Sequence, residues 1–350
     1  MAPLEAELAL ARVRDAAVVT PVAAPSGRPR VSVITAAYNA EAFLATTLGC
    51  VGAQTFGDFE HLVIDDGSKD GTAEVVRRVM AEDPRVRLIQ QTNRGLAATR
   101  NAGLGAAHGE LIAFLDHDDV WHPQKLALQV ALLDATPAAG VASCYSAVTG
   151  ADGAQLGWRF GGNADGDVYW EMLEWDMVSG GSVALCRRTG FERVGGFDES
   201  LPMRSDWDMW IRLARHYPFV TVPRVLVGYT RSPTSASRQY ERLAAAGAAV
   251  LAKAARDDPR FSARFQRFCR ARDSFAVACM CTIDDHIGLA WTYLARSLAT
   301  TPAPLLCAPR RWAMVAVLVL KTVLPARIFE RVFALLSRWS FGLTTGRPFD

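Results

Sequence analysis

Residues 111–119 read Leu111-Ile112-Ala113-Phe114-Leu115-Asp116-His117-Asp118-Asp119, an apolar run that ends in three carboxylates within four residues. The run predicts a buried β-strand, so the carboxylates stand at its end. Charges beside an apolar core must be paired or bound to a metal, and oxygen ligands suit a hard divalent cation such as Mg²⁺ or Mn²⁺. A simpler interpretation is that Asp118 or Asp119 caps a helix that begins near His122.

The composition sets the broad class of the protein. The chain has 350 residues, half of them hydrophobic, which is enough for one large core or two domains. Its net charge of +2 is too near balance to indicate a nucleic acid partner. Seven scattered cysteines are typical of reduced core residues in a cytosolic protein. The first residues contain no uninterrupted apolar segment, so we expect no signal peptide.

Strand and helix patterns alternate on both sides of residues 111–119. Strands are expected over 31–35, 61–64, 86–89 and 111–115, and helices over 40–51, 71–82 and 95–107. This alternation predicts an α/β fold with a mostly parallel sheet flanked by helices. Ligands bind at the carboxyl ends of such strands. Those ends carry Tyr38-Asn39, Asp65-Asp66, Gln91–Arg94 and Asp116–Asp119, so all the polar candidates lie on one predicted edge.

The second half of the chain changes character. Strand patterns over 141–148 and 181–185 enclose a Gly/Asp/Trp-rich stretch, typical of a substrate-site loop or of a plain β-hairpin insertion. A helix is expected over 206–216, and the last hundred residues are helical and Ala/Arg-rich. The predicted organisation is a short helix and linker over 1–29, an enzyme-like domain over 30–237 with halves at 30–120 and 140–237, and a helical C-terminal subdomain over 238–350.

Five motifs of the first domain occur together in a fixed order. They are Val31-Ser32-Val33-Ile34 with Tyr38-Asn39, Val63-Ile64-Asp65-Asp66-Gly67-Ser68, Asn93-Arg94-Gly95-Leu96, Arg100-Asn101-Ala102-Gly103 and Leu115-Asp116-His117-Asp118-Asp119. In this order and spacing, residues 30 to 237 resemble glycosyltransferase family 2. The resemblance implies a GT-A fold and an inverting enzyme that uses a nucleoside diphosphate sugar.

The resemblance gives the first strand ends a role in binding the donor. Asp66 would accept a hydrogen bond from the base, which favours uracil, thymine or guanine, and Tyr38 would stack on or border that base. Asp65 would orient the ribose or the turn, although it also fits a plain turn residue. Arg94 and Arg100 would lie near the phosphates, with a solvated surface position as the alternative for either.

The resemblance also implies the reactive groups. Asp118 would bind Mg²⁺ or Mn²⁺, and Asp116 would contact the ribose, or the metal through water. Asp206 would be the base that takes the proton of the acceptor hydroxyl, with a helix cap as the alternative. Family members usually carry Glu before this Asp, whereas this chain has Ser205.

The remaining predicted contacts come from two later loops and a helix. Gly195, Gly196 and Trp207 would border the acceptor, because glycines let the backbone approach a sugar closely. Arg231 would clamp the diphosphate, although Ser232 stands where the family often has His.

The C-terminal region carries a possible membrane signal. The apolar run Trp312–Leu320 is too short to span a bilayer. Basic residues surround it, and two tryptophans could serve as interface anchors: Arg310, Arg311, Lys321, Arg327, Arg331 and Arg338, with Trp312 and Trp339. This composition fits a helix pair lying on an anionic membrane, or equally a basic helix packed on its own domain or on another subunit.

Together these patterns predict a metal-dependent inverting glycosyltransferase of the cytoplasm, either free or on the inner face of the cell membrane. It would transfer a single sugar to a hydroxyl of a glycan or lipid-linked glycan, since the Gln-x-x-Arg-Trp signature of processive synthases is missing. The alternative is a catalytically silent nucleotide-sugar-binding protein that acts as an assembly partner. The sequence indicates neither the sugar, the base nor the oligomeric state.

Overall fold

The computed structural model describes residues 27–149, 155–159 (backbone only), 164–230, 235, 238–308, 311–325 and 328. By its internal contacts the chain divides into two compact units. Unit 1 comprises the chain up to Tyr169 together with Asp176–Ser232. Unit 2 comprises Trp170–Trp175 and the chain from Pro233 onward. The helix predicted over residues 1–20 lies outside the described residues.

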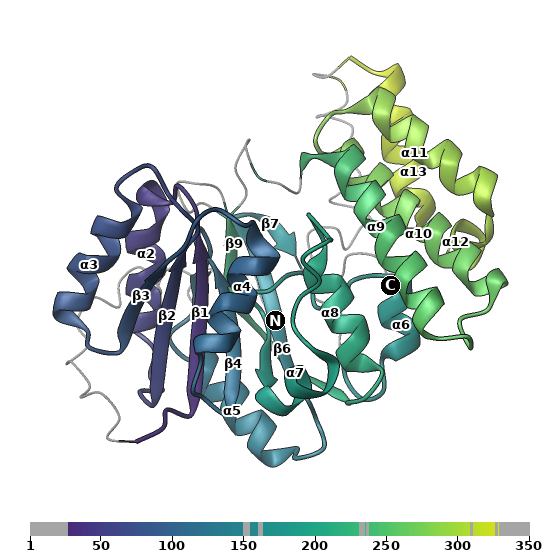
Figure 1. Cartoon of the computed structure of the whole chain (residues 1–350). Coiled ribbons are helices and arrows are strands. Elements are labelled where there is room, and N and C mark those ends of the chain that lie inside the picture. Colours follow the sequence, from purple (N-terminus) through teal and green to yellow (C-terminus); the bar gives the residue numbers. More distant parts are fainter. Residues whose placement is uncertain are drawn as a thin grey trace. The chain divides into compact units, whose positions relative to one another are not determined.

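Unit 1 is built on one sheet of nine strands, shown in Figure 1. Four neighbouring strands are parallel, in the order β3-β2-β1-β4. Their bounds are Val31–Ala37 for β1, Phe59–Asp65 for β2, Val86–Gln90 for β3 and Leu111–Asp116 for β4. In register, Ala37 pairs with Asp65 and Ala36 with Asp116. The two acidic strand ends therefore flank the end of β1, as the β-α-β alternation predicts.

Beyond β4 the sheet becomes mixed. Strand β8 is antiparallel to β4 and β6, β9 is parallel to β6, and β5 and β7 are antiparallel edge partners of β9 and β6. The bounds are Val120–Trp121 for β5, Val141–Thr149 for β6, Gln155–Arg159 for β7, Leu185–Arg187 for β8 and Phe219–Thr230 for β9. The predicted α/β class with a GT-A type sheet is confirmed. The parallel pairing of the sheet is limited to the four strands β3-β2-β1-β4 and to the pair β6–β9.

The strand predicted over 181–185 is displaced, because β8 begins only at Leu185. Ser179 and Gly180 both have positive φ, which breaks the extended chain before it. The carbonyls of Ser182 and Val183 accept hydrogen bonds from side chains of Trp121 and Gln129 instead of joining a ladder.

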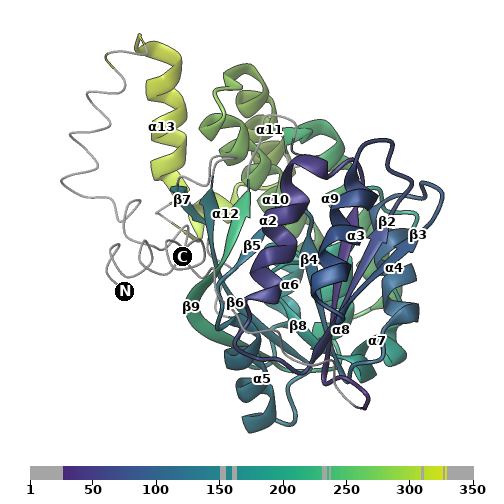
Figure 2. The same cartoon turned by 90° about the vertical axis from the view of Figure 1, so that its left-hand side faces the viewer.

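Helices cover both faces of the sheet (Figures 1 and 2). On one face α2 and α3 bury an aliphatic cluster against Val63 of β2. On the other face α4 lies so close that a Cβ on Gly103 would meet Ile34 at 2.4 Å. Neighbouring residues of a strand point to opposite faces, so β1, β2 and β4 are buried on both sides, whereas the edge strand β3 is partly exposed. The helix bounds in unit 1 are Glu41–Gly52 for α2, Thr72–Glu82 for α3, Leu96–Ala106 for α4, Lys125–Ala135 for α5, Arg188–Val194 for α7 and Ser205–Ala214 for α8.

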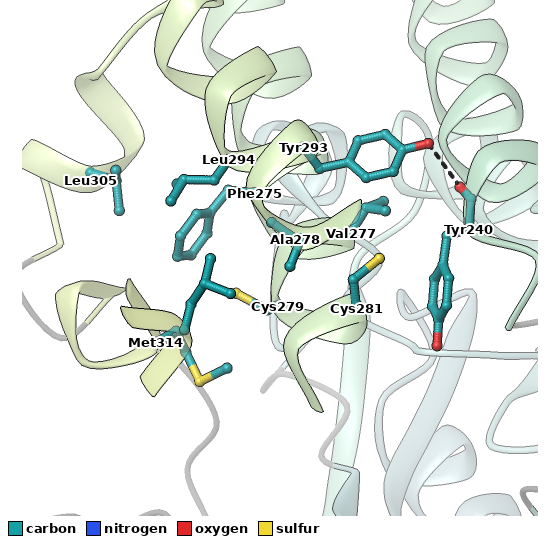
Figure 3. Close-up of a cluster of buried hydrophobic side chains, with 12 residues drawn as sticks. Tyr240, Phe275, Val277, Ala278, Cys279, Cys281, Tyr293, Leu294, Leu305 and Met314 are labelled. Carbon is teal, nitrogen blue, oxygen red and sulfur yellow. Dashed lines mark hydrogen bonds between the residues drawn. The ribbon is translucent and has the colours of Figure 1, made fainter. Parts of the chain in front are cut away.

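Unit 2 is helical, as expected for the C-terminal region. Its helices are Tyr169–Glu174 for α6, Tyr240–Asp257 for α9, Ala263–Ile283 for α10, Ile287–Thr300 for α11, Ala303–Leu306 for α12 and Arg311–Val323 for α13. Figure 3 shows its core, in which Phe275, Leu294 and Met314 pack together. The hydroxyl of Tyr293 donates to the carbonyl of Tyr240 over 3.4 Å and links α11 to α9. Among the described residues, no helix has both the length and the apolar character that crossing a bilayer requires.

Candidate active site

The first part of the ligand edge is the turn after β1. Tyr38 is 43% exposed at the strand end, so its ring is open to a planar ligand. The next residue, Asn39, has a φ of 49°, a conformation that Asn tolerates better than most residues. Its side-chain oxygen accepts the backbone N–H of Lys69 over 2.9 Å. The turns after β1 and β2 are therefore tied together.

The second part is the turn after β2, where both carboxylates accept hydrogen bonds on both of their oxygens. Asp65 accepts the N–H of Ser68 over 2.9 Å and the side-chain amide of Gln90 over 3.0 Å. Asp66 accepts the side-chain amide of Gln91 over 2.8 Å. It also accepts two backbone N–H groups, from residue 94 over 2.8 Å and from residue 95 over 2.9 Å. Both residues are buried, and Asp66 fixes the start of α4.

Gly67 allows these contacts. It has a φ of +74°, and a Cβ there would meet the backbone nitrogen of Asn93 at 2.9 Å. Any other residue would push the segment around Arg94 away from Asp66.

The two predicted phosphate-side arginines lie in different environments. Arg94 has an exposed side chain that pairs with Glu199 over 3.2 Å. Arg100 is only 2% exposed and pairs with Asp116 over 2.7 Å. Burial alone would lower the pKa of the Arg100 guanidinium, yet that pKa is raised because the carboxylates of Asp116, Asp206 and Asp119 surround it. Arg100 is thus a buried cation among three acids.

The third part of the edge is the acidic turn, residues 116–119. Burial raises the pKa of the Asp118 carboxyl, and the neighbouring Asp116 carboxylate also raises it, against a lowering effect of His117. The pKa of Asp119 is raised well above its ordinary value by burial and by the carboxylates of Asp118 and Asp116. Negative charge in this turn is therefore incompletely compensated by the protein.

The helix-cap interpretation of the acidic turn is wrong. Helix α5 begins at Lys125 with Gln124 as its N-cap, and no side chain caps it. The Asp119 carboxylate instead accepts the Ser182 hydroxyl over 2.6 Å and the N–H of Thr230 over 3.0 Å. The carboxylate thus joins three segments far apart in the sequence.

Asp206 lies in the first turn of α8, half-buried, and its Oδ1 accepts the N–H of Trp207 over 2.9 Å. The N-cap of this helix is Arg204, with a φ of 57°, so Asp206 is not the cap. The effect of Asp206 on Arg100 shows that it lies near the acidic turn, although the sequence separates it from Asp116 by ninety positions. Trp207 is 2% exposed, and the Arg204 guanidinium covers its ring at 5.3 Å.

The predicted acceptor loop is held from both sides. Gly195 has a φ of +83° and ends α7. A Cβ on Gly196 would meet Asn101 Oδ1 at 2.5 Å, so the absent side chain makes room for Asn101. Asn101 accepts the N–H of Phe197 over 2.7 Å, and Arg212 of α8 donates to the Gly196 carbonyl over 2.9 Å. The loop is thereby anchored to α4 and α8.

Three polar residues at this edge received no role from the sequence: Thr47, Asn101 and Ser182. Thr47 of α2 donates to the carbonyls of residues 117 and 119, over 2.8 and 3.0 Å. Asn101 belongs to one of the family motifs, but the motif predicts no partner for it. Ser182 gave no local signal at all. Arg231, the predicted diphosphate clamp, lies outside the described residues.

The acidic turn fits a divalent cation by the chemistry of its donors. Asp116 and Asp118 are partly exposed hard-oxygen ligands, and Asp116 also pairs with the Arg100 guanidinium over 2.7 Å. Among the described residues, no group of three or more His, Cys, Asp or Glu is placed to hold a metal ion by itself. Mg²⁺ commonly binds one or two carboxylates and takes its other ligands from phosphates and water. The pair therefore suits a cation shared with a diphosphate.

The family comparison agrees with the motifs. Residues 32–184 match the family model described as Glycosyl transferase family 2. The predicted resemblance to this family is confirmed.

Relatives share the same segment. An uncharacterized glycosyltransferase of Nostoc is 37% identical over 124 residues, which are 35% of this chain and 38% of that protein. Chondroitin synthase of Escherichia coli is 26% identical over 203 residues, 56% of this chain and 28% of that protein. A candidate teichuronic acid biosynthesis glycosyltransferase of Bacillus subtilis is 38% identical over 104 residues, 29% of this chain and 41% of that protein. The chain thus covers less than half of each of these relatives.

Two solved structures share the fold. Staphylococcus aureus TarS, residues 1–349, superposes with a TM-score of 0.55 at 18% identity and covers 89% of this chain and 93% of that one. A mannosyltransferase of Pyrobaculum calidifontis, in complex with GDP-Man and Mn²⁺, gives a TM-score of 0.53 at 24% identity, covering 91% and 93%. Both confirm the GT-A type fold.

Proposed function

We propose that this chain is an inverting glycosyltransferase that moves one sugar from a nucleoside diphosphate sugar to an acceptor hydroxyl. The position of Arg100 carries the proposal. This buried cation pairs with Asp116 and lies within electrostatic reach of Asp206, so the predicted donor side and the predicted base lie around one point. The nearness of both groups to Arg100 supports an inverting displacement, in which the leaving group and the base would act on opposite faces of one sugar carbon.

Asp206 would take the proton of the acceptor hydroxyl. Its carboxylate lies in the first turn of α8, and it is one of the carboxylates that raise the pKa of Arg100. A carboxylate so placed contributes about 10²- to 10⁴-fold to the rate.

The donor would lie across the ends of β1, β2 and β4. The exposed ring of Tyr38 is open for stacking on the base. Asp66 would accept the N–H of the base, and the exposed side chain of Arg94 would reach the phosphates. Asp116 and Asp118 would hold Mg²⁺ or Mn²⁺, which when bound would neutralise charge on the departing diphosphate. Relatives solved with UDP-GlcNAc and with GDP-Man and Mn²⁺ support this donor class.

The acceptor would be a hydroxyl of a glycan or lipid-linked glycan. Relatives named for chondroitin and teichuronic acid synthesis support polysaccharide assembly. A cytoplasmic location at the inner membrane face would suit a lipid-linked acceptor.

Helix α13 gives partial support to membrane binding. Trp312 is 49% exposed and Val323 65% exposed, so apolar side chains face outward. Two of its basic residues are engaged, because Arg311 is buried and Lys321 pairs with Asp285 over 2.6 Å. The other predicted cations, Arg310, Arg327, Arg331 and Arg338, lie outside the described residues, as does Trp339. Sedimentation with anionic and with neutral vesicles tests this part of the proposal, and no binding to either would contradict it.

The donor site is tested with the full chain and the common nucleoside diphosphates. Thermal unfolding is followed with UDP, GDP and dTDP, each with and without Mn²⁺. One nucleotide should raise the unfolding temperature progressively as its concentration increases above its dissociation constant, and more so with Mn²⁺. If none does, the donor site is refuted.

The base is tested by Asp206→Asn. We expect release of nucleoside diphosphate from the sugar donor, with acceptor present, to fall about 10²- to 10⁴-fold while nucleotide binding is kept. Glu192→Gln is the matched control, since this exposed acid of α7 has no proposed role. Native turnover in Asp206→Asn would contradict the assignment. Binding without turnover in the native chain would favour the silent binding protein instead.

A further inference from the structure

Ser182 lies beneath the acidic turn and contacts it twice. The residue is 3% exposed, and its hydroxyl oxygen accepts the backbone N–H of Asp116 over 3.0 Å. Its proton is therefore directed elsewhere, and it is donated to Asp119 Oδ2 over 2.6 Å. One hydroxyl thus joins the first and last residues of the turn.

The backbone around Ser182 is fixed by buried side chains. The indole N–H of Trp121 donates to the Ser182 carbonyl over 2.8 Å, and the amide of Gln129 donates to the next carbonyl, that of Val183, over 2.8 Å. Lys125 donates to the amide oxygen of Gln129 over 2.8 Å and lies 3.9 Å from the centre of the Trp121 ring. These side chains are fully buried, so the serine is held without help from a ligand.

Asp119 is turned away from the ligand edge. Its second oxygen, Oδ1, accepts the N–H of Thr230 over 3.0 Å, and the residue is 1% exposed. With both oxygens occupied, this carboxylate serves the turn and leaves cation binding to its neighbours. Outer-shell partners of this kind orient metal ligands and affect affinity.

We infer that Ser182 is a positioning residue whose hydroxyl, through the Asp116 N–H and the Asp119 carboxylate, presents Asp116 and Asp118 to a divalent cation and keeps Asp119 out of its coordination. The inference rests on the proposed function and deepens it, because it names the residue that sets cation affinity. Neither the family motifs nor the local sequence indicate it.

The test measures Mn²⁺ binding directly, from the electron paramagnetic resonance signal of free Mn²⁺ in the presence of UDP or GDP. We expect Ser182→Ala to weaken Mn²⁺ binding about 10- to 100-fold, the usual effect of removing an outer-shell partner. Ser182→Thr keeps the hydroxyl and should recover most of the affinity. Ser143→Ala is the matched control: it removes another buried serine hydroxyl, which is 2.9 Å from Thr221 Oγ1 within the same sheet, and should bind as the native chain does.

The variant Asp119→Asn tests whether Asp119 holds the acidic turn in place or binds the cation. If Asp119 only supports the turn, this variant should bind Mn²⁺ more tightly than Asp118→Asn does. An equal loss of Mn²⁺ affinity in Asp119→Asn and Asp118→Asn would mean that Asp119 is a ligand, and this would overturn the inference. Native Mn²⁺ affinity in Ser182→Ala would also overturn it. Unfolding temperatures without Mn²⁺ identify any variant that is merely unfolded. If the native chain itself binds no Mn²⁺ with either nucleotide, the proposed function fails. If it binds and Ser182→Ala binds equally, only this inference fails.

Discussion

The turns after β2 and β4 carry two and three acids on either side of the end of β1, and the two groups use their charge in opposite ways. Asp65 and Asp66 together accept five hydrogen bonds, all from backbone or side-chain amide N–H groups. Asp116, Asp118 and Asp119 crowd together, and the last two have raised pKa values. Asp65, Asp66 and the buried Asp119 use their oxygens to hold the fold, whereas Asp116 and Asp118 are partly exposed and remain open to a ligand cation.

The largest expected contrast comes from Asp118→Asn. Turnover of the donor should fall about 10²- to 10³-fold, by analogy with the loss of one group that stabilises developing negative charge. The ligand-free fold should keep or gain stability, because the variant removes a charge that burial disfavours. Steady-state kinetics and urea unfolding of the same preparation measure both. A strong loss of stability would mean that the two turns do not differ as described.

Asp66→Asn should produce the reverse pattern. An amide at this position places a donor where Asp66 accepts backbone N–H groups at 2.8 and 2.9 Å. We expect a loss of about 1.5–3 kcal/mol in the free energy of unfolding, the range for a buried hydrogen bond to a charged group. Urea unfolding at neutral pH measures it, with Glu82→Gln, an exposed acid at the end of α3, as control. Unchanged stability would remove the structural role of Asp66.

The smallest expected effect is the pH dependence of cation binding. The raised pKa values of Asp118 and Asp119 mean that the folded chain binds more protons than the unfolded chain above about pH 4. Without a cation, these groups therefore make stability fall as pH rises from there through the raised folded pKa values.

Mn²⁺ competes with those protons, so its stabilising effect should grow with pH over the same range. The expected slope is at most about 1.4 kcal/mol per pH unit for each proton displaced. Unfolding with and without Mn²⁺ from pH 4 to 7 measures it. Asp66→Asn should keep this pH dependence of Mn²⁺ stabilisation, and Asp118→Asn should reduce it. The same slope in both variants would contradict the proposed difference between the two turns.

The sequence predicted the acidic residues at the carboxyl ends of the strands better than it predicted the side chains that hold them in place. Alternating strands and helices place Asp66 and Asp116 at one edge because parallel strands end together, and the motifs add Asp206. Ser182 could not be predicted, because its partners lie 66 and 63 residues earlier and no local pattern encodes them. The burial of Arg100 was hidden for the same reason: its environment is made by Asp116, Phe197 and Gly181, which the chain brings from three elements. The roles of the predicted ligand residues remain predictions.

Six residues of unit 2, Trp170–Trp175, lie within the sequence of unit 1 and are therefore synthesised before the rest of unit 2. Trp170 packs edge-on against Phe265, and Glu174 pairs with Arg272, so both partners belong to a much later part of the chain. On the ribosome, residues 170–175 emerge well before those partners exist, with Met172 and Leu173, which are fully buried in the finished fold. A protein shortened after Ser232 would therefore retain residues 170–175 without the later helices of unit 2 that bury Met172 and Leu173.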